Sequence, residues 1–216
     1  LAMNMVVTQI NKNHVYETGS FLYDKGIKVF CATPAGACSY MPNSLLLTSK
    51  EIVKTLDDLI KLRDGLGMRV DVVEPLPRCL VNNPIKYEHF FRRDCAAGRM
   101  TVSINPLGEV TPCTHVSRSY GNILKESLGD IWKKMKEWRD GSFTPKGCFP
   151  CAELETCSLG CREASKIVSG SIDSLDPWAR SALGSKRETR EPEVVDSTTR
   201  LKVSSTIRFR EEGKDF

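Results

Sequence analysis

The stretch CFPCAELETCSLGC, residues 148–161, carries four of the nine cysteines of the chain within 14 residues. They are Cys148, Cys151, Cys157 and Cys161, in the spacing C-x2-C-x5-C-x3-C. A metal requires such close spacing because thiolate sulfurs must converge on one small volume, and tight turns bring them there. Soft sulfur ligands select zinc, copper(I) or iron–sulfur clusters. The stretch therefore predicts a metal-bound, loop-rich fold, with zinc and iron–sulfur both open.

A second pair of cysteines flanks a predicted hairpin. Cys95 lies before two short extended stretches, 101–104 and 109–111, and Cys113 follows them. Gly108 is the turn residue that lets the chain reverse there. Beyond the hairpin, apolar residues at helical spacing predict a helix over 124–139 whose apolar stripe belongs to the core.

Alternating strands and helices are predicted before the cysteine-rich part. β-branched and apolar residues predict strands over 4–10, 27–32 and 68–74. We expect Asn13 to cap the helix between the first two strands, and Thr48 with Glu51 to form a capping box at the start of the next helix. Short links between strand, helix and strand are typical of a parallel sheet. Two crossovers are too few to close a barrel.

The predicted organisation has three parts. Residues 1–78 form an α/β region, and the change to cysteines and turns after Pro75-Leu76-Pro77 begins a loop-rich domain over 79–183. The polar residues 184–216 predict a linker with a short β tail.

Composition excludes several classes of protein. With 40% hydrophobic and 27% charged residues the chain has room for one large or two small cores, which excludes wholesale disorder. The net charge of +4 is too small for nucleic acid or an anionic membrane to be the main partner. No apolar run approaches the roughly 18 residues of a membrane span, and the first residues lack a secretion signal. We therefore expect a cytoplasmic protein, whose reducing surroundings leave thiols available to metals.

Together these motifs resemble the SPASM domain, the auxiliary iron–sulfur module at the C-terminus of many radical S-adenosylmethionine (SAM) enzymes. The family pattern has a cysteine, a glycine and a cysteine around a hairpin, then C-x2-C-x5-C-x3-C, then a last cysteine. The chain matches every part but the last over about residues 79–179. Residues 1–78 are similar to the last strand and helix units of the partial (β/α)6 barrel of these enzymes. The resemblance thus implies an α/β fold, with the C-terminal part of that barrel followed by a small SPASM domain.

The resemblance also implies one or two auxiliary 4Fe-4S clusters with interleaved ligands. One cluster takes Cys95, Cys113 and Cys161, with Cys79 as the upstream cysteine. The other takes Cys148, Cys151, Cys157 and a final cysteine. The sequence departs from the family here, because Asp176-Pro177-Trp178-Ala179 stands where members often have D-P-x-C, and Ala179 cannot ligate iron. Three alternatives stay open: a three-cysteine iron site with one open position, a non-cysteine fourth ligand such as Asp176, and a degenerate or absent cluster.

A larger departure is the absence of C-x3-C-x2-C, the family motif for the cluster that cleaves SAM. Cys31 and Cys38 do not have this spacing. We therefore expect the chain to be the C-terminal portion of a radical SAM enzyme, with SAM and a third 4Fe-4S cluster held by an N-terminal half. The portion alone is expected to be inactive, and its sequence identifies no catalytic or SAM-binding residue.

For the whole protein the resemblance implies radical modification of a substrate, with a peptide or protein as the expected substrate class. It also implies an electron donor such as flavodoxin or ferredoxin. Two other functions stay open: a zinc-stabilised binding module, and a cluster-bearing electron-transfer subunit without radical chemistry.

Overall fold

The computed structural model describes residues 1–39 and 41–180. These residues belong to the first of the two units into which the chain divides, Leu1–Ser185 and Lys186–Phe216. The predicted linker and β tail over 184–216 lie outside the described residues. No helix in the described part of the chain is long and apolar enough to cross a membrane.

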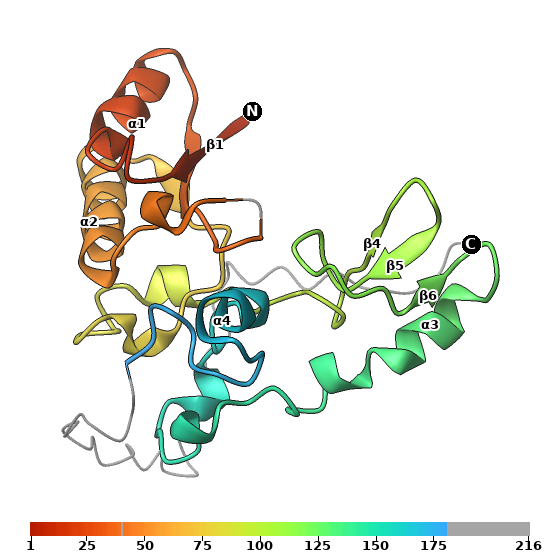
Figure 1. Cartoon of the computed structure of the whole chain (residues 1–216). Coiled ribbons are helices and arrows are strands. Elements are labelled where there is room, and N and C mark those ends of the chain that lie inside the picture. Colours follow the sequence, from red (N-terminus) through yellow and green to blue (C-terminus); the bar gives the residue numbers. More distant parts are fainter. Residues whose placement is uncertain (40, 181–216) are drawn as a thin grey trace, which may run out of the picture. The chain divides into compact units, whose positions relative to one another are not determined.

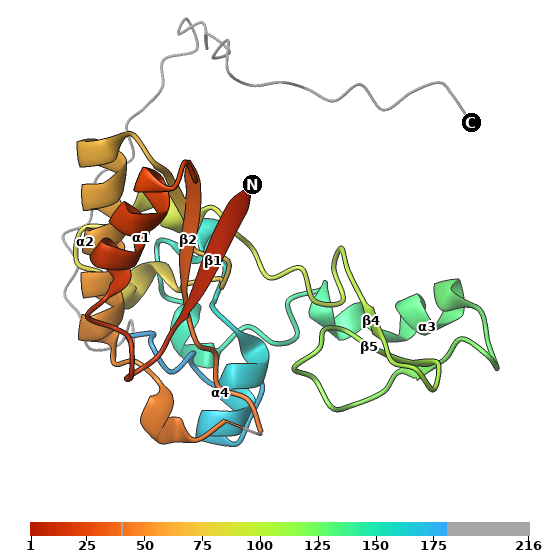
Figure 2. The same ribbon diagram turned by 90° about the horizontal axis from the view of Figure 1, so that it is seen from above.

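A parallel sheet with two helices on one side forms the first part of the chain (Figures 1 and 2). The strands are β1 (Ala2–Val7), β2 (Val29–Pro34) and β3 (Arg69–Asp71), in the order β1-β2-β3. The helices that connect them are α1 (Val15–Asp24) and α2 (Ser49–Leu66). The predicted strand–helix alternation and the parallel sheet are confirmed, although β3 is shorter than the predicted third strand.

The core of this part follows from the two periodicities of the sequence. Alternate residues of β2, Phe30 and Ala32, are fully buried. On α2, buried residues such as Ile52 and Leu59 recur at helical spacing and belong to the same apolar cluster. Gly19 of α1 allows the two helices to approach closely, because a Cβ atom there would lie 2.2 Å from Leu62 Cδ1.

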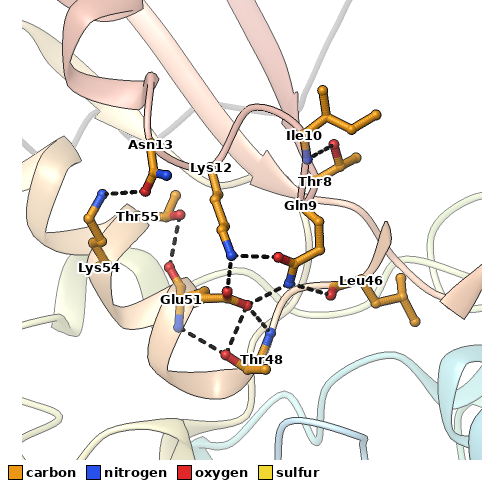
Figure 3. Close-up of polar contacts among 10 residues, drawn as sticks. All are labelled: Thr8, Gln9, Ile10, Lys12, Asn13, Leu46, Thr48, Glu51, Lys54 and Thr55. Carbon is orange, nitrogen blue, oxygen red and sulfur yellow. Dashed lines mark hydrogen bonds and ion pairs between the residues drawn. The ribbon is translucent and has the colours of Figure 1, made fainter. Parts of the chain in front are cut away.

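Polar side chains fix the loop between β1 and α1 against the start of α2 (Figure 3). The predicted capping box is present, since the Glu51 N–H donates to Thr48 Oγ1 and the Thr48 N–H donates to the Glu51 carboxylate. The same carboxylate accepts hydrogen bonds from Gln9 and Lys12. Asn13 is not the helix cap that the sequence predicts; it accepts a hydrogen bond from Lys54 instead, and His14 precedes α1.

A small antiparallel sheet lies in the second half of the chain. Its strands are β4 (Ser103–Ile104), β5 (Glu109–Thr111) and β6 (Gly121–Asn122), in the order β4-β5-β6. The predicted hairpin is confirmed as β4 and β5, and its Gly108 has a positive φ of 81°. The third strand, β6, has no counterpart among the predicted elements.

The helix after this sheet is shorter than predicted. Ser127 caps α3 (Leu128–Lys134), and a 3₁₀ turn, Lys136–Trp138, continues the chain. Ile131, Met135 and Trp138 are nevertheless buried in a second apolar cluster, as the predicted core stripe requires, whereas Leu128 at the start of α3 is exposed. The last helix, α4 (Arg162–Ser169), ends at Gly170, whose φ of 82° suits only glycine well.

Candidate metal centre

Tight turns arrange the four cysteines of residues 148–161. Cys148 closes the 3₁₀ turn Lys146–Cys148, and the Cys151 N–H donates to the Cys148 carbonyl at 2.9 Å. A second 3₁₀ turn, Leu154–Thr156, leads to Cys157, and Cys161 is the residue before α4. The sequence predicts tight turns between the closely spaced cysteines of this stretch, and the structure has them.

One group of thiols contains Cys79, Cys148, Cys151 and Cys157. Burial, followed by the neighbouring thiols of Cys157 and Cys79, raises the pKa of Cys148 to about 11, with a smaller contribution from Cys151. The Arg78 N–H donates to Cys157 Sγ at 3.5 Å, which places Cys79, the next residue, at this group. The resemblance implies that Cys79 is a ligand together with Cys95, Cys113 and Cys161, whereas in the structure Cys79 lies near Cys148 and Cys157.

A second group brings Cys95, Cys113 and Cys161 together around Glu74. Burial raises the pKa of Cys95, and Cys113 and Glu74 raise it further. Burial and then Glu74 raise the pKa of Cys161, with a smaller effect from Cys95. The pKa of Cys113 is raised in the same way, by burial first and by Glu74 to a smaller extent.

Glu74 is a residue of this site that the sequence pattern did not single out. Burial raises the pKa of its carboxyl to about 7, although a hydrogen bond with Cys161 lowers it. Glu74 follows β3, at the carboxyl end of a parallel strand, where ligand-binding residues of α/β folds gather. Its place at the end of the predicted strand over 68–74 is the signal that could have found it.

Asp176 holds the backbone beside Cys161. Its Oδ2 accepts the Cys161 N–H at 2.8 Å, and its Oδ1 accepts the Trp178 N–H at 2.8 Å. Burial raises the pKa of this carboxyl to about 6. Gly160 lies so close that a Cβ atom there would be 2.2 Å from Asp176 Oδ2. Asp176, which the sequence offered as an oxygen ligand, thus binds backbone N–H groups from two segments of the site.

The donor chemistry of the two groups fits iron–sulfur clusters, since seven soft thiol donors lie in two sets. In the described part of the chain, no three His, Cys, Asp or Glu side chains are already arranged to hold a single metal ion. Two buried polar atoms among the described residues, Arg162 Nε and Glu163 Oε2, have no hydrogen-bond partner. Buried polar atoms of this kind are rare, and Glu163 raises the pKa of Cys113 next to it.

A cavity of about 290 Å³ adjoins both groups. Cys95 of one group and Cys157 of the other line it, together with Trp138, Phe143 and Arg162. Cys31 lies elsewhere, on β2, where burial and then Asp71 raise its pKa. It therefore belongs to neither group.

Comparison with known proteins shows what this chain is similar to. The family model described as "SPASM: Iron-sulfur cluster-binding domain" matches residues 95–162. The chain is 28% identical over 109 residues to "Mycofactocin maturase MftC" of Mycolicibacterium smegmatis, which covers 45% of this chain and 28% of that protein. Residues 95–162 are thus similar to the SPASM iron–sulfur cluster-binding domain. "AdoMet-dependent heme synthase" of Nitratidesulfovibrio vulgaris is 29% identical to this chain over 89 residues, 39% of the chain and 24% of the relative.

Solved structures share the fold of this chain. "Native anSMEcpe with bound AdoMet" matches with a TM-score of 0.56 at 20% identity, over 82% of this chain and 51% of that one. "Crystal structure of Streptococcus suis SuiB" matches with a TM-score of 0.57 at 16% identity, over 82% of this chain and 45% of that one. The expected fold, the C-terminal part of a partial barrel followed by a SPASM domain, is thereby confirmed. The chain spans about half the length of these structures and about a quarter of the length of the curated relatives.

Proposed function

We propose that this chain binds auxiliary 4Fe-4S clusters through its two thiol groups and, in the whole protein, supports radical modification of a peptide or protein. The observation that carries the proposal is the gathering of seven cysteines into two sets beside one cavity. The ligands are Cys79, Cys95, Cys113, Cys148, Cys151, Cys157 and Cys161.

The chain's own residues bind and enclose the clusters. Burial raises the pKa of Cys95, Cys113, Cys148 and Cys161, so these four thiols give up their protons when their sulfurs bind iron. The backbone N–H of Arg78 donates to the sulfur of Cys157, and such hydrogen bonds tune cluster potential. When bound, auxiliary clusters can relay an electron or hold a substrate group.

A peptide substrate is supported by two relatives. One structural neighbour, "Native anSMEcpe with bound AdoMet and Cp18Cys peptide", holds a peptide, and MftC is named a maturase. The cavity beside Cys95 and Cys157 is the place in this chain where a peptide side chain would meet both clusters. S-adenosylmethionine, a third 4Fe-4S cluster, and an electron donor such as flavodoxin or ferredoxin complete the proposed activity, in a cytoplasmic setting.

Metal analysis of anaerobically purified chain tests the proposal. We expect about eight iron and a matching amount of labile sulfide per chain for two clusters. Cys157→Ser should lower the iron content by about half, whereas Cys31→Ser, a thiol outside both groups, should leave it unchanged. One or two zinc ions with no sulfide would support the zinc-stabilised binding module instead, and loss of iron in Cys31→Ser would refute the ligand assignment.

A further inference from the structure

The sulfur of Cys79 lies beside the backbone of Ala179. The Arg180 N–H donates to Cys79 Sγ at 3.2 Å, across 101 residues of sequence. The nitrogen of Arg180 is bonded directly to the carbonyl carbon of Ala179. The Cys79 thiol therefore lies next to the peptide bond that joins Ala179 to Arg180. Ala179 is the position where the family pattern has its last cysteine.

The turn that carries Cys79 is fixed to the cysteine stretch at several points. Ser158 Oγ donates to the Leu76 carbonyl at 2.9 Å, and the Arg78 N–H donates to Cys157 Sγ. The Arg78 guanidinium also donates to the carboxylate of Glu153, four residues before Cys157, at 2.9 Å. These contacts hold the 3₁₀ turn Arg78–Leu80 against residues 153–158.

The segment that carries Ala179 is fixed as well. Trp178 is buried in the core of the parallel sheet and its Nε1 donates to the Leu47 carbonyl at 3.1 Å. The Ala179 N–H donates to the Asp176 carbonyl at 2.8 Å. The approach of Cys79 to this segment therefore joins two parts of the chain that are each held by other contacts.

We infer that Cys79 supplies the fourth thiolate of the cluster held by Cys148, Cys151 and Cys157, in place of a cysteine at position 179. The inference rests on the proposed function, because it concerns which thiol completes a cluster. On binding, the Cys79 sulfur forms a bond to iron and its proton goes to solvent. The other group then has three thiols, Cys95, Cys113 and Cys161, with the Glu74 carboxylate as its oxygen neighbour.

A paired substitution tests the inference. The isosteric variant Cys79→Ser should reduce iron from about eight to between about four and seven per chain after anaerobic reconstitution. It should also change the electron paramagnetic resonance spectrum of the reduced protein, because one iron loses its thiolate. The double variant Cys79→Ser with Ala179→Cys should recover the wild-type iron content and spectrum, because the thiol introduced at position 179 lies near the position of the removed Cys79 thiol.

Each outcome separates the inference from the proposed function. Wild-type chain without iron and sulfide would overturn both. Wild-type chain with two clusters, together with a Cys79→Ser variant that keeps the same iron content and spectrum, would overturn the inference alone. Failure of Ala179→Cys to restore iron, in a double variant whose far-ultraviolet circular dichroism matches wild type, would also overturn it. Cys31→Ser, a thiol on β2 outside both groups, serves as the matched control and should leave iron and spectrum unchanged.

Discussion

The carboxylate of Glu51 is the centre of the network that joins β1 to α2, and its removal gives a pH-dependent prediction (Figure 3). The Lys12 ammonium first, and then the Thr48 N–H, lower the pKa of Glu51 to about 2 from its usual 4.5. A carboxyl whose pKa is lower in the folded state stabilises the fold above its unfolded pKa. That stabilisation is lost as the pH falls from about 4.5 towards 2.

The loss of stability on removing the Glu51 charge follows from the pKa difference and, separately, from the contacts that the carboxylate makes. The full difference in pKa would correspond to about 3 kcal/mol at pH 7. Because the Glu51 side chain is 23% exposed, solvent screening reduces this to about 1–2 kcal/mol. A capping interaction of about 1 kcal/mol plus one charge-assisted hydrogen bond leads to the same range.

The assay is urea unfolding of wild type and Glu51→Gln, followed by the fluorescence of tryptophans, of which Trp178 bonds to Leu47 just before the capping box. We expect the variant to be less stable by about 1–2 kcal/mol at pH 7, and the difference to fall below half of that at pH 3. Glu17→Gln is the control, because Glu17 lies in the first turn of α1 and is 74% exposed. A difference that is the same at pH 3 as at pH 7 would refute the assignment of this stabilisation to the charge of Glu51.

Two further predictions concern the support of the metal centre. Asp176→Ala should lower the free energy of unfolding in urea by about 2–4 kcal/mol, because two buried backbone N–H groups lose their acceptor. The control Asp173→Ala removes an exposed carboxylate and should change the free energy of unfolding little. Equal effects of the two substitutions would contradict this interpretation. Gly160→Ala should speed the loss of iron to a chelator. Gly160 has a φ of 71°, and a Cβ atom there would lie 2.2 Å from Asp176 Oδ2, so alanine does not fit without moving the loop. An unchanged rate of iron loss would contradict this prediction.

Local patterns in the sequence predicted most of the secondary structure. The capping box of Thr48 and Glu51, the turn at Gly108 and the buried apolar residues from Ile131 to Trp138 each depend on residues within a few positions of one another. Asn13 was predicted wrongly as a cap because Lys54 on α2, a distant residue, binds its side chain. Strand β6 was missed because two residues, Gly121 and Asn122, carry no periodic signal.

By itself, the sequence determined the alternation of strands and helices, the resemblance to the SPASM domain, and the seven cysteines as candidate ligands, because periodicity and cysteine spacing are short-range properties of the chain. The tertiary structure alone decided how those cysteines divide: it placed Cys79 with Cys148 and Cys157, and it brought Glu74 to Cys95 and Cys161. These partners lie far apart in sequence. Their meeting depends on burial of residues such as Leu80 and Trp178 in a shared core, which no spacing within one segment can specify.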